Sequence, residues 1–524
     1  MSILEAVLTS IREHWLAAGL LVPIIYIVSV AFYRLYLHPL ANVPGPKLAA
    51  ATWLYEIYFW KKFVIEIGRL HDIYGPIVRI TPNEVHVNDP ALIDAVYPGG
   101  GKKVDKDPYQ VRMFGIPDTA FLTIDHETHR IRRGALNRYF SKAAVNKIEP
   151  YIREAAEKLC SCIASYAGSD TVTISVAFSS FTTDVITEYL FAKSYHMIDR
   201  PHFLPNLQAG NDSLGELLPI LKQLPFLHTV MRWIPQERML KMNPGMASWI
   251  RVEQDCHQQV KDAHARLAKP DRVYYTVIDE LLHADLPPEE KRDDRLFLEA
   301  VVLINAATET TSWNLSLATF YLLHQPHTLA TLRQELLTAS GDSLELPSLT
   351  TLENLPYLQA TVAETLRHAY GVVQRLIRVH QDPVHLRSTV KIPNRDGSEK
   401  VQVKEVSYVI PKGYSLSMTS LWIHKNPDLF PDPDKFAPER WLDAEGMKRK
   451  DLDRYLMSFS KGTRQCLGIN LAYAELYICI AAVVLRLGDQ LELFETDRSD
   501  VEFDHDVFAM RPKPETKGIR VTVR

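Results

Sequence analysis

The stretch from Phe459 to Gly468 (FSKGTRQCLG) contains the residues whose types and spacing are best suited to chemistry. Cys466 lies between Gly462 and Gly468, and Arg464 precedes it. A structural zinc ion takes about four protein ligands, whereas one thiolate is enough for an iron whose other in-plane donors come from a porphyrin. Glycine lets the backbone approach a flat macrocycle, and a guanidinium matches the carboxylates of haem propionates. The alternative is a small buried cysteine, but the spacing of the whole stretch favours a haem-binding loop.

A second polar group lies in the middle of an apolar segment that we predict to be one helix from Asp293 to His324. Glu309 and Thr310 place a carboxylic acid beside an alcohol, a pair able to relay protons to a small bound ligand. Because threonine and serine hydroxyls bond to carbonyls of the preceding turn, we expect a local break in the helix here. The alternative is a threonine-rich helix surface exposed to water.

A third group could support the cysteine loop without taking part in chemistry. Glu364 and Arg367 share a face of a predicted helix because they are three positions apart. Arg440 and Trp441 follow further along, before the cysteine loop. Exposed pairs of this kind contribute little, whereas a buried set would form a rigid scaffold that is costly to break.

Bulk properties narrow the class of protein. The chain has 524 residues, is 46% hydrophobic and has a net charge of −4, which gives no electrostatic argument for binding nucleic acid. Its 5 cysteines are odd in number and sparse, which argues against a disulfide-built secreted protein. Helical patterns dominate. Residues 75–88 predict a β-hairpin, and residues 388–418 are β-like, with a turn at Asp396-Gly397. We therefore expect a mainly α (α+β) fold, a large helical domain with small β-sheets.

The N-terminal segment is typical of a membrane anchor. Residues Trp15 to Tyr33 contain no charged side chain and are long enough to cross most of a bilayer as a helix. A cleaved signal peptide is the competing interpretation, and the acidic residues before the apolar run argue against it. Prolines from Pro39 to Pro46 predict a stiff elbow. The expected organisation is an anchor at 1–38, an elbow at 39–50 and one large domain at 51–524.

In their order along the chain, these motifs resemble those of the cytochrome P450 family. The matching segments are the cysteine loop, the Glu309-Thr310 pair, the Glu-x-x-Arg helix and the Pro-Glu-Arg-Trp segment. Within these segments two positions depart from the family pattern: Ala307 replaces a glycine, and Trp441 replaces a phenylalanine. The resemblance implies the P450 fold and a haem b cofactor whose iron is bound by the thiolate of Cys466.

The resemblance also implies roles for other side chains. Phe459, Gly462, Arg464 and Gly468 would complete the haem-binding loop, and Thr310 with Glu309 would be catalytic, delivering protons to bound oxygen. Further contacts to the haem propionates would come from His129, Arg133 and Arg378. His129 stands where the family has tryptophan, so we expect this contact to depend on pH.

In its detailed sequence, the chain is most similar to fungal microsomal enzymes of secondary metabolism, including the trichodiene-oxygenase-like group. This implies a monooxygenase of the endoplasmic reticulum membrane, with its catalytic domain in the cytosol. It would hydroxylate or epoxidise a hydrophobic small molecule, terpenoid in class, using O2 and electrons from NADPH-cytochrome P450 reductase, with cytochrome b5 as a further partner. The open alternatives are a polyketide or indole-alkaloid oxidase, a haem-thiolate isomerase or dehydratase, and a non-catalytic haem-binding protein.

Overall fold

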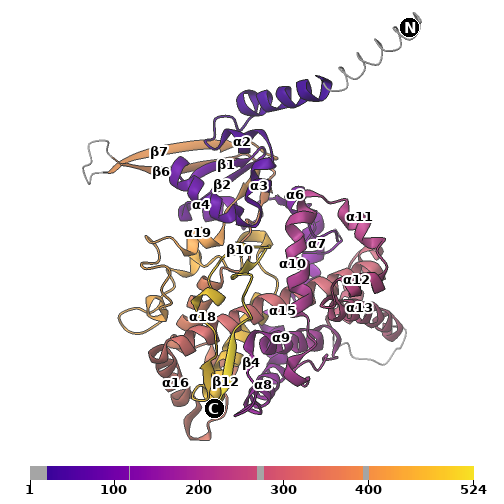
Figure 1. The fold of residues 1–524 in the computed structure, drawn as a ribbon, viewed down its shortest axis with the longest axis vertical. Helices are drawn as coiled ribbons and strands as arrows, with labels where there is room; N and C mark the ends of the chain where they lie inside the picture. Colours follow the sequence, from indigo (N-terminus) through magenta and orange to yellow (C-terminus); the bar gives the residue numbers. More distant parts are fainter. Residues whose placement is uncertain (1–20, 117, 268–275, 394–400) are drawn as a thin grey trace, which may run out of the picture. The chain divides into compact units, whose positions relative to one another are not determined.

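The chain forms two compact units, seen here in a computed structural model that describes residues 21–116, 118–267, 276–393 and 401–524. Unit 1 comprises Met1–Val96 and Arg378–Met418, and unit 2 comprises Tyr97–Ile377 and Thr419–Arg524. Helices dominate, and the sheets are small (Figure 1). The predicted mainly α class with small β-sheets is confirmed.

Unit 1 holds most of the β structure. Strands β1 (Ile77–Thr81) and β2 (Glu84–Val87) form the hairpin predicted from the sequence, with antiparallel pairing. β2 pairs in parallel with β8 (Ser415–Ser417), which pairs antiparallel with β5 (Arg378–His380). Strands β6 (Val384–Pro393) and β7 (Val401–Ile410) pair antiparallel. The turn predicted between them, at 396–397, lies outside the described residues. The helices of this unit are α2 (Lys47–Ala51), α3 (Leu54–Phe59), α4 (Phe63–Tyr74) and α5 (Ile93–Val96).

An apolar helix, Leu21–Leu37, begins the described part of unit 1. It covers only part of the predicted membrane span, because residues 15–20 lie outside the described residues. The described part is shorter than a full span and exposes apolar side chains such as Ile25 and Ile27. Its end is tied to the unit by Arg34, whose Nη1 donates to the carbonyl of Ala51 at 2.7 Å.

The helices of unit 2 supply the core of the protein. Four long helices form the centre of this core: α8 (Lys142–Ala164), α9 (Ile174–Phe191), α15 (Asp293–His324) and α20 (Ile469–Leu487). The others are α6 (Pro108–Val111), α7 (His126–Asn137), α10 (Gln208–Gln223), α11 (Leu227–Arg232), α12 (Gln236–Met242), α13 (Met246–Leu267), α14 (Val277–His283), α16 (Pro326–Ser340), α17 (Leu349–Leu352), α18 (Pro356–Ala369) and α19 (Ser420–His424). Short strands are β3 (Val104–Lys106), β4 (Val172–Thr173), β9 (Leu491–Leu493), β10 (His505–Asp506), β11 (Met510–Arg511) and β12 (Arg520–Val523).

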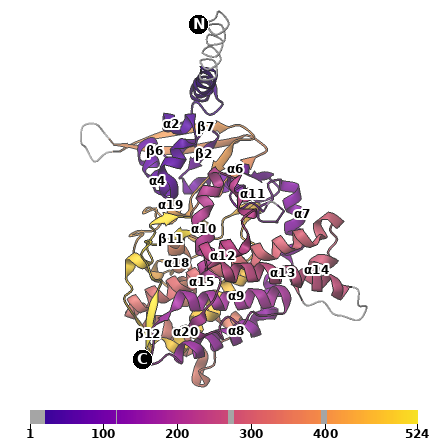
Figure 2. The same ribbon diagram turned by 45° about the vertical axis from the view of Figure 1, so that its right-hand side comes forward.

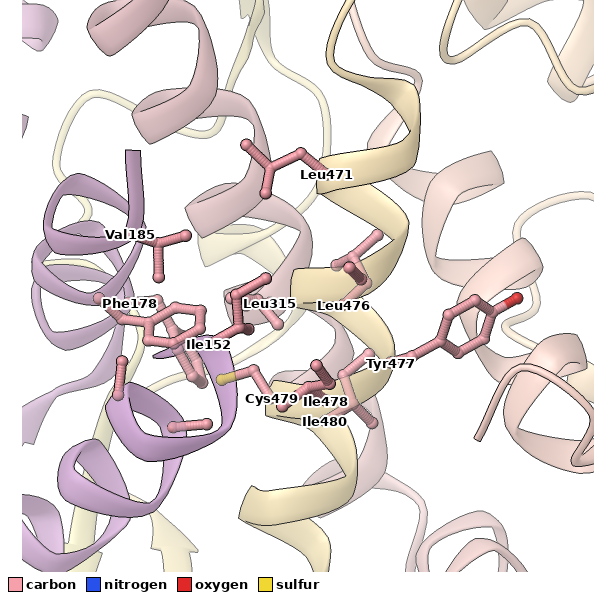
Figure 3. Packing of buried hydrophobic residues seen from close by; sticks show 14 of the residues in the cluster. Ile152, Phe178, Val185, Leu315, Leu471, Leu476, Tyr477, Ile478, Cys479 and Ile480 are labelled. Carbon is pink, nitrogen blue, oxygen red and sulfur yellow. The ribbon is translucent and has the colours of Figure 1, made fainter. Parts of the chain in front are cut away.

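The four long helices pack against one another (Figure 2). Leu315 of α15 and Cys479 of α20 meet Phe178 of α9 and Ile152 of α8 in one apolar cluster (Figure 3). α20 is long and apolar enough to cross a membrane, but most of it is buried inside the protein. It is therefore a core helix, as its apolar faces predict.

α15 spans the residues predicted for it, but the expected break is not present. Thr310 Oγ1 donates to the carbonyl of Ala306 at 2.8 Å, as expected for a helical threonine. The helix nevertheless runs without interruption from Asp293 to His324. Thr182 of α9 donates to the carbonyl of Thr308 at 3.1 Å, which joins α9 to this stretch of α15.

Candidate functional site

The cysteine loop is closed by its own backbone and held against residues 97–98. The N–H of Cys466 donates to the carbonyl of Phe459 at 2.9 Å, and that of Thr463 donates to Pro98 at 3.2 Å. Gly462 has a φ of +73°, and a Cβ there would lie 2.5 Å from the carbonyl oxygens of Tyr97 and Pro98. Glycine is required at 462 because the backbones approach so closely.

Cys466 differs from the other cysteines because it is exposed, while Cys160, Cys256 and Cys479 are buried and Cys162 is half-buried. It lies just before the N-terminus of α20. Protein surrounding the thiol raises its pKa, whereas the N–H of Gly468 and the charge of Arg133 lower it. A helix N-terminus and an N–H donor both favour the thiolate. Among the described residues, no group of three or more histidine, cysteine or acidic side chains could hold a metal ion.

The surroundings of the thiol leave room for a flat group. A Cβ added at Gly468 would meet no atom within 4 Å. In the middle of α15, Ala306 and Thr310 are exposed although Ile304, Thr308 and most later residues of the helix are buried. α15 packs against α20, the helix that begins directly after the cysteine loop. The residues present therefore fit a haem bound through Cys466.

Arg133 connects α7 to the cysteine loop. Its Nη1 donates to the carbonyl of Gln465 at 2.9 Å and its Nη2 to that of Cys466 at 3.3 Å. His129 lies one turn earlier and is buried. Burial, followed by the charge of Arg464, lowers the pKa of His129 to about 2, so its imidazole is neutral at physiological pH. The dependence on pH expected for a contact between His129 and a propionate stays a prediction.

Arg464 is buried and bonded to backbone oxygens. It donates to the carbonyl of Thr123 at 2.7 Å and to that of Ile124 at 2.8 Å. It thereby joins the cysteine loop to the segment that leads into α7. These bonds were not foreseen, because the carbonyls lie more than three hundred positions away along the chain. Arg378 is also buried but lies in unit 1, at the start of β5.

Glu309 and Thr310 point to different partners. Thr310 Oγ1 bonds within its own helix. The carboxylate of Glu309 forms an ion pair with Arg511 on β11. Arg511 was not singled out from the sequence, because a lone arginine in a C-terminal segment has no distinguishing neighbours.

The predicted scaffold is present and is more extensive than expected. Glu364 Oε1 lies 2.8 Å from Arg367 Nη2 and 3.0 Å from Arg440 Nε, with the glutamate and Arg367 fully buried. Trp441 adds a hydrogen bond, its indole Nε1 donating to Glu364 Oε2 at 2.8 Å. The phenylalanine usual at this position could not make this bond. The substitution therefore supplies a donor to a buried carboxylate.

His424 joins this scaffold to the cysteine loop and was missed in the sequence. Its Nδ1 lies 2.9 Å from the carbonyl of Arg367, and its Nε2 accepts from the N–H of Met457 at 2.8 Å. The imidazole is therefore neutral, with the proton on Nδ1. Met457 lies two residues before the loop, so the two hydrogen bonds fix the start of the loop to α18. No sequence signal marks a histidine whose partners come from two distant segments.

The sequence of the chain is similar to those of known proteins. A family model described as cytochrome P450 matches residues 43–399 and 394–516. Cytochrome P450 monooxygenase tpcC of Cochliobolus heterostrophus is 35% identical, with 100% of both chains covered. Cytochrome P450 monooxygenase TRI4 of Fusarium sporotrichioides is 35% identical over 94% of this chain and 91% of its own. Tryptophan 6-hydroxylase fscE of Fusarium equiseti is 37% identical, with 96% of each chain covered.

The fold and the site thus define a haem-thiolate oxidoreductase of the monooxygenase class. The chain belongs to the cytochrome P450 family. Its cofactor is haem, whose iron takes a cysteine thiolate as axial ligand, and it incorporates molecular oxygen into a hydrophobic substrate with the help of a redox partner.

Proposed function

We propose that Cys466 is the axial ligand and that the protein oxygenates a secondary metabolite of the terpenoid class by hydroxylation or epoxidation. One observation carries the assignment of the ligand: Cys466 is exposed, and its sulfur accepts the N–H of Gly468 at the start of α20. Phe459, Gly462 and Gly468 shape the loop around it. Arg464, Arg133, His129 and Arg378 are the proposed contacts to the propionates.

When bound, haem with a thiolate ligand supplies the activation of O2. The protein's own residues hold the cofactor, exclude water and move protons. Thr310 is exposed at the centre of α15 and offers a hydroxyl there. Glu309, its neighbour, is the proposed source of the protons that pass through this hydroxyl. An intact acid–alcohol pair also favours oxygenation over isomerisation, dehydration or passive haem binding.

Cys466→Ser tests the ligand, with Cys162→Ser as the matched control because Cys162 is half-buried and lies on α8. The carbon-monoxide difference spectrum of the wild type should be that of thiolate-ligated haem. The control should keep this spectrum, and Cys466→Ser should lose it. A thiolate spectrum in Cys466→Ser would refute the assignment of Cys466 as the axial ligand.

The substrate pocket is proposed to include three phenylalanines. The rings of Phe114 and Phe508 have centroids 5.2 Å apart, and those of Phe114 and Phe121 are 5.7 Å apart. Phe121 stays 38% exposed, which leaves apolar ring surface for a ligand. An apolar, aromatic wall suits a terpenoid skeleton, because burial of apolar surface drives such binding.

An indole substrate is the second candidate. Tryptophan 6-hydroxylase fscE is 37% identical to the chain, and N-acetyltryptophan 6-hydroxylase ivoC of Emericella nidulans is 34% identical. Edge-to-face contacts from the three phenylalanines would also suit an indole ring. A polyketide remains a further alternative of the same reaction class.

A substrate screen separates these candidates. The loaded protein, with NADPH, O2 and purified cytochrome P450 reductase, is incubated with sesquiterpenes, with tryptophan and N-acetyltryptophan, and with aromatic polyketides. The terpenoid proposal expects oxygenated product only from the sesquiterpenes. Product from the indoles alone would replace it, and product without NADPH would refute the proposed source of electrons. Cytochrome b5 is proposed to raise the rate when added.

We also propose that residues 1–38 anchor the protein in the endoplasmic reticulum membrane, with an elbow at 39–50 and the monooxygenase domain at 51–524 in the cytosol. The exposed apolar side chains of the helix Leu21–Leu37 support this proposal. Such side chains are favourable in lipid and unfavourable in water.

A further inference from the structure

Arg511 joins the helix that carries the candidate proton donor to a helix on the surface of unit 2. Its guanidinium pairs with Glu309 of α15 and lies 3.3 Å from Asp212 Oδ1 of α10. The arginine side chain is only 18% exposed. One cation on β11 therefore holds two carboxylates from two other elements.

The cluster contains more acid than base. On α10, Glu216 lies 3.6 Å from His505 Nε2, and Asp504 accepts from His505 Nδ1 at 2.9 Å. Three of the carboxylates that face Arg511 and His505 are partly exposed: Asp212 to 52%, Glu216 to 48% and Glu309 to 32%. Removing the positive charge of Arg511 would leave Glu309 and Asp212 to repel each other.

α10 is shaped to admit this arginine. A Cβ at Gly215 would lie 3.4 Å from Arg511 Nη2 and 3.2 Å from Val507 Cγ2. A Cβ at 215 would press on Val507 and would already be in contact with the guanidinium, so a longer side chain there would compete with Arg511 for this space. The glycine, which lowers helix propensity, is explained by this close passage.

α10 lies partly exposed on the surface of unit 2. Only Gly210, Asn211, Gly215, Leu221 and Lys222 of its residues are buried. At its C-terminal end, Gln223 accepts from the hydroxyl of Tyr109 at 2.8 Å, and the carbonyl of Lys222 accepts from Arg112 at 2.6 Å. Asp212 lies in the exposed middle of α10, so we expect its ion pair with Arg511 to limit the movement of this stretch.

We propose that Arg511 is a positioning residue that fixes the carboxylate of Glu309 and ties it to Asp212, so that the acid is held or released with the position of α10. This proposal rests on the proposed role of Glu309 in proton delivery. α10 contacts the segment at 109–112, next to the phenylalanines of the proposed pocket. A substrate bound in that pocket can thereby change the position of the Glu309 carboxylate through α10.

The structural half of the proposal is tested by hydrogen exchange, which does not depend on activity. Arg511→Met should raise exchange several-fold in peptides covering 208–223, at unchanged haem content. Asp212→Asn, which leaves both Arg511 and Glu309 in place, should raise it as well. Arg498→Met, which removes an exposed ion pair with Glu502, is the matched control and should change nothing. Unchanged exchange in α10 in both test variants would overturn the proposal.

The functional half is tested by the fraction of NADPH electrons recovered as hydrogen peroxide with purified reductase. Arg511→Met should raise this fraction several-fold, Arg511→Lys should restore most of it, and Arg511→Met added to Glu309→Gln should have no further effect. If Glu309→Gln leaves the fraction at the wild-type value, the proposed role of Glu309 fails. If Glu309→Gln raises the fraction and Arg511→Met does not, only the positioning role of Arg511 fails.

Discussion

Trp441 and Glu364 show how one side chain can alter a buried network of charges. The carboxylate of Glu364 accepts from Arg367, Arg440 and Trp441. A buried carboxylate needs all its lone pairs satisfied, because water is not available to replace a lost donor. The tryptophan therefore belongs to the scaffold and is not a neutral exchange for phenylalanine.

We expect Glu364→Ala to yield little haem-loaded protein, because it leaves the charges of Arg367 and Arg440 without a buried partner. Breaking such a pair from one side costs about 3–5 kcal/mol. Trp441→Phe, which removes a single hydrogen bond to a charged acceptor, should cost about 1.5–3 kcal/mol and still load haem. Chemical unfolding and haem content measure both effects. Normal haem content in Glu364→Ala would contradict the structural role.

His424 makes the stability of the protein depend on pH. Burial, followed by the charge of Arg367, lowers the pKa of His424 to about 3. The unfolded chain takes up this proton more readily, with an ordinary pKa of about 6.5. The contribution of His424 is therefore complete above about pH 6.5 and is lost as the pH falls towards the folded pKa.

We expect the free energy of unfolding to fall below about pH 6.5, with a contribution from His424 approaching 1.4 kcal/mol per pH unit. His424→Gln keeps a donor and an acceptor but does not titrate, so its stability should fall less steeply between pH 6.5 and 4. Unfolding midpoints measured across this range check the prediction. Parallel curves for the two proteins would show that His424 does not contribute.

At the scale of elements, the cysteine loop contains two glycines with different tasks. Gly462 is needed for the fold, because its φ is positive and the carbonyls of Tyr97 and Pro98 are close. Gly468 has a φ of −83°, which any residue adopts, and a Cβ there meets no protein atom within 4 Å. The two positions therefore separate folding of the loop from binding of the cofactor.

We expect Gly462→Ala to lower the unfolding midpoint of the protein and to reduce haem loading, because the loop must move away from residues 97–98. Gly468→Ala should leave the stability of the haem-free protein unchanged and should weaken haem binding only, since the new methyl group enters the space proposed for the cofactor. Haem titration and thermal unfolding distinguish the two variants. Equal stability losses in both would refute this division.

Local patterns were sufficient to predict several elements. The limits of α15 and the hairpin of β1 and β2 were both confirmed. These predictions depend on residues within one turn or one hairpin, where spacing determines which side chains share a face. The predicted break in α15 was wrong, because the hydroxyl of Thr310 bonds to the carbonyl of Ala306 without interrupting the helix.

At the scale of the whole chain, we expect that the N-terminal helix can be cut before Arg34 without disturbing the rest of unit 1. Arg34 donates to the carbonyl of Ala51, and its own carbonyl accepts from Arg79 Nη1 at 2.9 Å. We expect deletion of residues 2–31 to move the protein from the membrane fraction to the soluble fraction with an unchanged carbon-monoxide spectrum.

Deletion of residues 2–38 is the matched comparison for this prediction. It also removes Arg34 and leaves the buried guanidinium of Arg79 without one of its acceptors, so the unfolding midpoint should fall. Sedimentation after cell lysis and thermal unfolding give the two measurements. Retention of the shorter deletion in the membrane fraction would contradict the proposed anchor.

By itself, the sequence determined the family, the cofactor class and the cysteine proposed to bind it, because these depend on residues close together in one loop. Only the tertiary structure revealed the side chains that hold this loop: Arg133 from α7, which donates to the carbonyl of Gln465, and His424 from α19, which accepts from the N–H of Met457. It also decided that Glu309 is paired with Arg511 and through it with Asp212. Such contacts join positions far apart along the chain, and packing of the folded elements brings them together.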